Sequence, residues 1–328
     1  MKKLLSASLL ALSTAAAAAA TTTAQAEDVT LQLKWVTQAQ FAGYYVAKDK
    51  GFYEEEGLNV TIKPGGPDIA PEQVIAGGGA DVITTWMPAG LAARERGLPL
   101  VNIAQPFSSG GLKFTCLKDS GVATTADFPN RTLGVWFFGN EYPFYAWMAK
   151  LGLKTDGSKD GVTVLKQAFN VDALLQKQAD CISVMSYNEY GQVLDAGITE
   201  DQLVTFDYKT EGVSVLEDRL KDPAFVETMA KFVRASMKGW KYVEQHPEEA
   251  AEIVVENDES GAQTIEHQTY MSKEIGKLTA GSDGKLDPAA YDETVATLLA
   301  AVSPDNPAIT KTPEGMAWTH AVTDIALK

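Results

Sequence analysis

The 328-residue sequence contains few histidines and cysteines, the residues that most often build zinc centres. Its three histidines, His246, His267 and His320, lie in helical patterns without the spacing of metal ligands. No Gly-x-Ser-x-Gly motif is present, and no Gly-Lys-Ser/Thr follows the Gly77-Gly78-Gly79 run. These absences argue against a zinc site, a serine hydrolase and a phosphate-binding loop, and we expect neither a metal nor a cofactor.

Beyond its N-terminus, the sequence has no apolar run long enough to span a bilayer. Lys2 and Lys3 precede a short apolar core, Leu4 to Leu12, and Ala24-Gln25-Ala26 fits a small-x-small cleavage site. We therefore expect residues 1–26 to be a signal peptide and the mature protein to be periplasmic. No cysteine directly follows the cleavage site, so a lipid anchor is not indicated.

Positive charge is also scarce, with 28 Lys and Arg against 43 Asp and Glu, a net charge of −15. Loss of Lys2 and Lys3 with the signal peptide would make it −17. A field of this sign argues against binding to nucleic acid or anionic membranes. The length fits two lobes, and the 45% of apolar residues is enough for each to bury a core.

Only two cysteines occur, Cys116 and Cys181, both in strand-like runs. In an exported protein they could form a disulfide. The alternative, which we favour, is two buried free thiols that pack as small apolar residues.

The apolar pattern alternates strands and helices as far as residue 207, which predicts a parallel sheet with helices on both faces, built twice. The predicted strands are 29–35, 60–63, 81–85, 100–104, 131–137, 162–166, 181–186 and 203–207. The predicted helices are 43–56, 72–76, 88–96, 142–151, 171–177 and 189–196. Residues 113–117 are expected to be an extended crossover.

A helical tail follows, with predicted helices at 224–244, 247–256, 262–278, 288–301 and 314–327. We expect this tail to pack back onto the first lobe. The predicted fold class is therefore α/β, with two lobes of mostly parallel sheet. Lobe 1 comprises residues 27–113 and 214–328, lobe 2 comprises residues 114–213, and hinges lie near Phe114 and Val213, where closure around a ligand would occur.

The most informative feature is that four predicted strands end in aromatic rings together with amide or carboxylate groups. In open α/β sheets, ligands bind outside the carboxyl ends of the strands. These residues are therefore the candidate ligand-binding site for a flat molecule with polar edges. The candidates are Trp35, Gln38, Gln40, Phe41, Tyr44, Trp86, Met87, Phe137, Gly139, Asn140, Glu141, Tyr142, Tyr187, Asn188 and Glu189.

The rings could sandwich a heteroaromatic ligand, with Trp35 and Trp86 on one lobe and Phe137 and Tyr142 on the other. Each offset stack would add roughly 0.5–1.5 kcal/mol beyond the burial of area. The alternative is that each ring is ordinary core packing. Because four rings occur at four equivalent junctions, we favour the cleft.

The polar candidates suit the edge of such a ring. Gln38 and Gln40 offer amide donors and acceptors, and Glu189 could accept hydrogen bonds from an exocyclic amine. Each also has a structural alternative: the glutamines as caps or solvated groups, Asn140 as a helix N-cap, and Glu141 and Glu189 as first-turn acids.

Together these residues carry a resemblance to a known family. The markers include Leu33-Lys34-Trp35, Gln38 to Val46, Gly77 to Val82, Gly134 to Phe144 and Ser186 to Tyr190. The chain from Asp28 to Lys328 resembles the exported substrate-binding proteins of ABC importers. The branch in question includes alkanesulfonate-binding proteins and thiamine-pyrimidine synthases.

The resemblance implies a monomeric two-lobe binder that delivers a small molecule to the permease subunits of an ABC importer. In the branch, ligands include thiamine-precursor pyrimidines and heterocycles such as riboflavin, or else sulfonates and nitrate. Compared with the family, residues 212–218, the return crossover, look short by several residues.

Two alternatives within the resemblance can be weighed from the residues. A thiamine-pyrimidine synthase would need a lysine and a histidine where this chain has Thr85 and Ala89, and a cysteine-rich motif that is absent. A sulfonate or nitrate site would need donors; Thr84, Thr85, Ser108, Ser109 and Gly110 could supply some, but no arginine lies at a predicted junction. We therefore expect a heterocycle-binding protein and not an enzyme.

Overall fold

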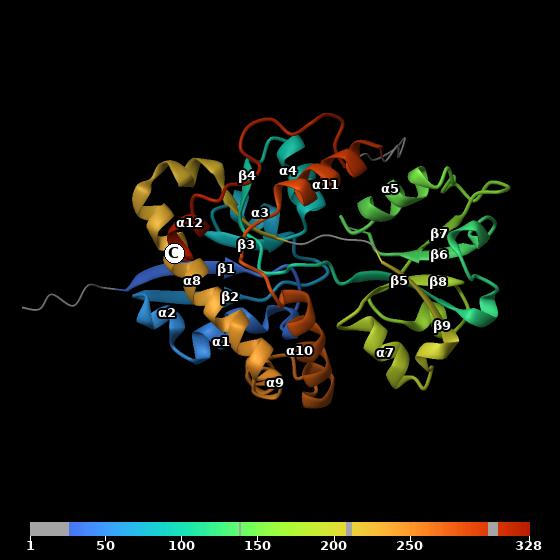
Figure 1. The fold of residues 1–328 in the computed structure, drawn as a ribbon, viewed down its shortest axis with the longest axis horizontal. Coiled ribbons are helices and arrows are strands. Elements are labelled where there is room, and N and C mark those ends of the chain that lie inside the picture. The colour runs from blue at the N-terminus through green and yellow to red at the C-terminus, as the bar shows by residue number, and fades with distance from the viewer. Residues whose placement is uncertain (1–25, 138, 208–211, 301–307) are drawn as a thin grey trace, which may run out of the picture.

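The computed structural model describes residues 26–137, 139–207, 212–300 and 308–328 (Figure 1). The predicted signal peptide therefore lies almost entirely outside the described residues. The chain forms two five-stranded sheets that lie next to each other along the long axis, each flanked by helices. The predicted two-lobe α/β fold class is confirmed.

The first sheet has the strand order β2-β1-β3-β10-β4, and the second has the order β7-β6-β8-β5-β9. The first sheet consists of β1 (Glu27–Gln32), β2 (Leu58–Lys63), β3 (Val82–Thr85), β4 (Leu100–Ala104) and β10 (Gly212–Leu216). The second consists of β5 (Leu112–Leu117), β6 (Thr132–Val135), β7 (Thr163–Lys166), β8 (Cys181–Met185) and β9 (Leu203–Asp207).

Each sheet contains one antiparallel strand, always fourth in order, and it is the strand by which the chain enters from the other lobe. β10 pairs antiparallel with β3 and β4, and β5 pairs antiparallel with β8 and β9. The segments 113–117 and 212–218, which we expected to be crossovers, contain the strands β5 and β10, and their pairing within the sheets was not predicted. The sequence pattern does not show that β10 lies between β3 and β4, or that β5 lies between β8 and β9.

The antiparallel pairing of β5 with β8 also decides the state of the cysteines. Cys116 and Cys181 lie directly opposite each other on these strands, with their Cα atoms 4.0 Å apart, and they form a disulfide. Our preference for free thiols was wrong, because the sequence did not reveal that these two strands pair with each other.

Helices cover both sheets. Around the first sheet lie α1 (Ala42–Asp49), α2 (Phe52–Glu55), α3 (Pro71–Ala76) and α4 (Met87–Glu95); around the second lie α5 (Tyr142–Lys150), α6 (Asp172–Leu175) and α7 (Glu189–Asp195). The predicted helix 43–56 is split into α1 and α2 by Gly51, whose φ of 72° suits glycine and ends α1.

The tail contains α8 (Pro223–Gln245), α9 (Pro247–Glu256), α10 (Ile265–Thr279), α11 (Pro288–Ala300) and α12 (Thr323–Ala326). The predicted helix 314–327 is mostly wrong. Its first part runs as a loop beside β4, where the Asn102 amide donates to Ala317 O (2.9 Å) and the Thr319 amide donates to Asn102 O (2.9 Å). No helix among the described residues is long and apolar enough to cross a membrane.

The tail packs on the first lobe through α8 and α9, which contact α1, but α11 also contacts α5 of the second lobe, which we did not expect. A Cβ added at Gly239 would lie 2.0 Å from Gly43 O, so the two backbones meet with no room for a side chain. Trp240 covers Gly43 in the same way and is buried. This packing fixes α1, the helix that follows the first group of candidate site residues.

Gly239→Ala should therefore destabilise the protein by about 2 kcal/mol, because a backbone carbonyl cannot move aside cheaply in a well-packed interface. Denaturant unfolding of the mature protein would measure this change. Gly276→Ala on α10 is the matched control, since its added Cβ would be 3.6 Å from the nearest heavy atom outside its own helix. This control should be neutral or stabilising. Equal effects of the two substitutions would contradict the proposed close packing.

Candidate functional site

A cavity of about 760 Å³ lies between the two lobes, where the strand-to-helix junctions of both sheets face each other. The first lobe contributes the segments that follow β1, β2 and β3. The second lobe contributes the segments that follow β6, β7 and β8. The location agrees with the rule that ligands bind beyond the carboxyl ends of parallel strands.

Most of the candidate residues from the sequence line this one cavity. They are Trp35, Gln40, Phe41, Tyr44, Trp86, Phe137, Gly139, Asn140, Glu141, Tyr142, Tyr187, Asn188 and Glu189. That they contact a ligand stays a prediction.

Two candidates are not in the cavity lining, because each is engaged elsewhere. Gln38 is buried, donates to Gln263 Oε1 (3.3 Å) and accepts from Gln40 Nε2 (3.2 Å). Met87 belongs to an apolar cluster with Leu91 and Leu298. The Gln38 side chain therefore neither caps a helix nor is solvated, the alternatives that we gave for it, and Met87 serves as core packing.

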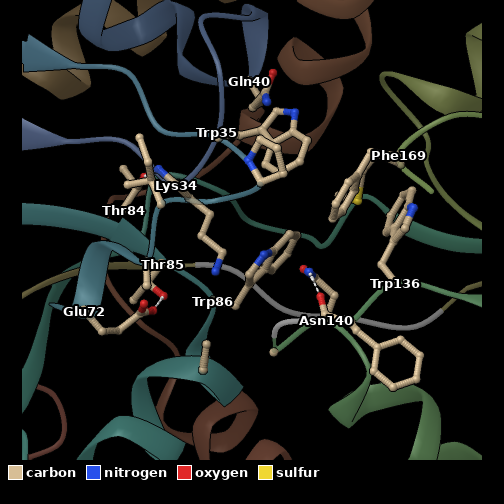
Figure 2. Close-up of a pocket in the computed structure, with 18 of the residues that line it drawn as sticks. Lys34, Trp35, Gln40, Glu72, Thr84, Thr85, Trp86, Trp136, Asn140 and Phe169 are labelled. Carbon is tan, nitrogen blue, oxygen red and sulfur yellow. Dashed lines mark hydrogen bonds between the residues drawn. The ribbon is translucent and has the colours of Figure 1, made fainter. Parts of the chain in front are cut away.

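The aromatic wall of the cavity differs from the predicted sandwich. Trp35 packs against Phe169 of the second lobe, with ring centroids 4.5 Å apart, and Phe169 stacks on Trp136 at 6.2 Å (Figure 2). Trp86 projects into the space beside this group. Phe137 instead lies under the ammonium of Lys166, 5.9 Å from its ring centroid.

Sequence reasoning missed Trp136 and Phe169. Trp136 adjoins Phe137, and both residues line the cavity, although we selected only Phe137. Phe169 follows β7, a junction that we did not use although it carries the same kind of residues, Gln167 to Asn170. The rule applied to the other four junctions would have found it.

The other end of the cavity is charged. Figure 2 shows Lys34 pointing into the cavity, near Trp86 and near Thr85, whose hydroxyl donates to Glu72. Arg96 and Lys166 also line the cavity. These cations were missed because Lys34 lies before the ring that drew attention and Arg96 lies at the end of α4, not at its start.

Glu141 is a buried carboxylate at this end of the cavity. Burial raises its pKa, and this effect is opposed by the backbone amides, including that of Gly139, which donates to Glu141 Oε2 at 2.8 Å, and by Lys34 and Lys166. Asn140 is not the N-cap that we predicted, because α5 begins after Glu141. The amide of Asn140 instead donates to Phe137 O (2.7 Å).

Glu189 is the second buried carboxylate and begins α7. Its Oε2 accepts from the Met185 amide (3.0 Å), and its Oε1 accepts from Asn188 Nδ2 (2.7 Å). Burial nevertheless raises the pKa of Glu189 to about 7, because these two donors and the backbone amide of Glu189 itself do not replace the lost hydration of the charge. Perturbed carboxylates in a cleft are typical of functional sites.

The raised pKa of Glu189 predicts a pH dependence of stability. The folded protein holds this proton from its usual pKa of 4.5 up to about 7, so the contribution to stability is present at acid pH and lost as pH rises through about 7. The size is on the order of 3 kcal/mol. Glu189→Gln should therefore unfold with a weaker pH dependence than wild type between about pH 4.5 and pH 7.

Chemical unfolding at a series of pH values would measure this difference. Glu227→Gln, which removes an exposed carboxylate from α8, is the control and should follow the wild-type profile. If the Glu189 variant also follows that profile, the carboxyl group is not held in the protonated form.

Comparison with known proteins identifies the family of this chain and proteins with a similar fold. A family model described as "NMT1/THI5 like" matches residues 38–250, more than half of the chain. A riboflavin-binding protein of Chloroflexus aurantiacus is 27% identical over 69% of this chain, and the match spans 65% of that protein, just under two thirds of its length. A formylaminopyrimidine-binding protein of Halalkalibacterium halodurans is 25% identical over 83% of this chain and 84% of that protein.

Matches to pyrimidine phosphate synthases are shorter. The enzyme of Aspergillus parasiticus is 32% identical, but over 31% of this chain.

Solved structures show the same fold. The putative periplasmic sulfonate-binding protein of Methylobacillus flagellatus superimposes with a TM-score of 0.64 at 15% identity, covering 92% of this chain and 94% of that one. The aliphatic sulphonate-binding protein of Escherichia coli gives a TM-score of 0.62 at 14% identity, covering 87% of this chain and 89% of that one.

Proposed function

Because this chain belongs to the NMT1/THI5-like family, we propose that it is a periplasmic solute-binding protein that delivers a small heterocycle to the permease of an ABC importer. The observation that carries the proposal is the cavity between the lobes, with an aromatic wall at one end and charged groups at the other. Relatives matched over most of the chain are named as binding proteins, which supports binding over synthesis.

The chemistry of the cavity favours a ring that carries a polar chain. Trp86 and the group formed by Trp35, Phe169 and Trp136 offer apolar faces to a flat ring. Lys34, and the hydroxyl and carboxylate of Thr85 and Glu72, combine donors with acceptors, as hydroxyl groups require.

The size of the cavity points the same way. Ligand pockets for drug-sized molecules measure roughly 300–1,000 Å³. At about 760 Å³, the cavity admits a three-ring flavin with its hydroxylated chain, and a single pyrimidine would fill much less of it. We therefore place riboflavin-like ligands before pyrimidines.

We further propose that the ligand bridges the two lobes and shifts the population toward the closed form. The closed monomer would then be recognised by the permease. The signal peptide predicted at residues 1–26 would take the protein to the periplasm.

Titration of the mature protein with riboflavin, a formylaminopyrimidine and taurine tests the ligand class. A ligand present at 100 times its dissociation constant should raise the unfolding free energy by about 2.7 kcal/mol, so thermal shift identifies binders. We expect riboflavin to bind and taurine not to bind. Stabilisation by taurine alone would overturn the heterocycle proposal.

Lys34→Met tests the charged end separately. It should weaken riboflavin binding about tenfold, the effect of losing one hydrogen bond to a charged group. The binding of lumichrome, the flavin ring without the chain, should not change. Lys63→Met is the matched control, because Lys63 lies at the end of β2 and its ammonium donates to Gly79 O outside the cavity. An equal loss for both ligands would contradict the assignment of the chain to this end.

A further inference from the structure

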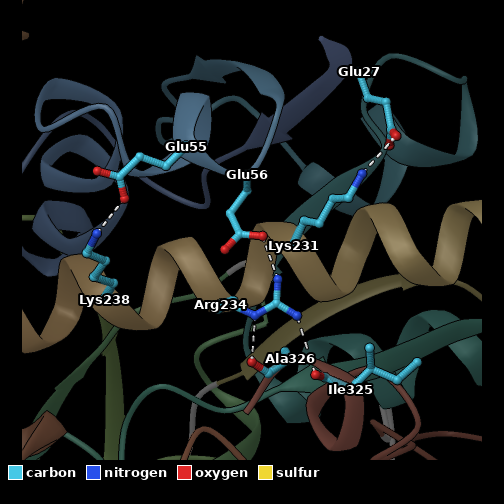
Figure 3. A network of polar contacts seen from close by, with 8 residues as sticks. All are labelled: Glu27, Glu55, Glu56, Lys231, Arg234, Lys238, Ile325 and Ala326. Carbon is cyan, nitrogen blue, oxygen red and sulfur yellow. Dashed lines mark hydrogen bonds and ion pairs between the residues drawn. The ribbon is translucent and has the colours of Figure 1, made fainter. Parts of the chain in front are cut away.

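Helix α10 belongs to the first lobe but contacts the second lobe beside the cavity. It packs on α8 and α9, and the Ser108 amide donates to Leu278 O (2.8 Å) near its C-terminal end. Helix α8 is itself tied to the first lobe by ion pairs of Lys231 with Glu27, Arg234 with Glu56 and Lys238 with Glu55 (Figure 3). Helix α10 is therefore held on the first lobe by α8, α9 and the Ser108 hydrogen bond.

Two side chains of α10 reach across to the junction between β8 and α7. Tyr270 Oη donates to Ser186 O (2.8 Å), and His267 Nε2 lies 2.8 Å from Asn188 Oδ1. The two rings stack on each other at 6.1 Å. These hydrogen bonds join residues of different lobes, so they form only when the lobes are together.

The second lobe is shaped to receive this contact. A Cβ added at Gly191 would lie 2.4 Å from the Tyr270 ring, so the absence of a side chain there lets Tyr270 lie directly on α7. Tyr270 is half-buried between the lobes. The approach of α10 to α7 is therefore a close fit at Gly191.

Asn188 connects this contact to the cavity. Its Oδ1 also accepts from Gln192 Nε2 (3.3 Å), and its Nδ2 donates to Glu189 Oε1 (2.7 Å). Since Oδ1 is an acceptor, His267 must carry its proton on Nε2 to make the bond. A chain of donors thus runs from His267 through Asn188 to Glu189, which lines the cavity.

We propose that His267 and Tyr270 are positioning residues that hold the lobes closed and couple closure to occupancy of the cavity through Asn188 and Glu189. A ligand group that donates to Glu189 keeps the carboxylate charged. The charge strengthens the donation from Asn188, which in turn strengthens the bond that Asn188 accepts from His267. This inference rests on the proposed solute-binding function but not on the identity of the solute.

Small-angle scattering of the unliganded mature protein, together with riboflavin titration, tests the closure contact. Tyr270→Phe and His267→Ala should each lower the ratio of closed to open molecules about fivefold, the effect of one lost hydrogen bond, and weaken riboflavin binding by at most the same factor. Where open molecules become more numerous, the radius of gyration rises. His267→Gln, which keeps a donor, should restore part of the loss.

Tyr242→Phe is the matched control for the tyrosine. Its hydroxyl donates to Glu249, and both residues belong to the tail of the first lobe. It should change neither the scattering nor the affinity. Unchanged scattering and unchanged affinity in both α10 variants would overturn the proposal.

A double-mutant cycle between His267 and Glu189 tests the coupling itself. If the chain of donors acts as a unit, His267→Ala combined with Glu189→Gln should weaken riboflavin binding by less than the product of the single effects. A loss equal to that product would overturn the coupling. If wild type binds no riboflavin, the ligand proposal fails, and the scattering of the unliganded variants still decides whether α10 holds the lobes together.

Discussion

In each sheet, the fourth strand is the first strand that the chain forms after it passes over from the other lobe. The rest of the structure depends on these two insertions, of β5 and of β10. β3 and β4 do not pair with each other, and β10 joins them although it lies more than 100 residues further along the chain. β5 has the same place between β8 and β9. The two connections between the lobes therefore enter the middle of each sheet, and the strand-to-helix junctions of both sheets line one cavity.

The cavity contains two kinds of surface, buried carboxylates and large apolar rings. Buried carboxylates need donors, and Glu141 and Glu189 obtain them mainly from backbone amides and a neighbouring asparagine. These donors leave both pKa values raised, which means that the hydration of each charge is only partly replaced. A solute that donates to these groups would supply what the protein does not. Large apolar rings, such as Trp35 and Phe169, also line the cavity and add buried area without polar groups.

The sequence was sufficient to predict the ends of the strands, and therefore the place of the cavity. The spacing of apolar residues and the turn residues are local signals that mark where each strand ends. The order of strands was not predictable in the same way. The positions of β5 and β10 depend on which gap each strand fills, and the disulfide between Cys116 and Cys181 follows from that pairing. That Trp136 lines the cavity together with Phe137 depends on the path of the chain after β6, which local signals do not specify. Residues 314–322 fail as a helix because β4 offers them backbone hydrogen bonds.

The late position of β10 in the chain also governs the sequence of events during synthesis. The second sheet is built entirely from residues 112–207 and can form as soon as that continuous segment has emerged. The first sheet must wait with the facing edges of β3 and β4 unpaired, and with α1 uncovered until α8 arrives. Open strand edges invite pairing with other chains. In the newly made polypeptide, β3, β4 and α1 are therefore exposed until the last third of the chain has been synthesised. These are the elements that a holding chaperone would need to shield.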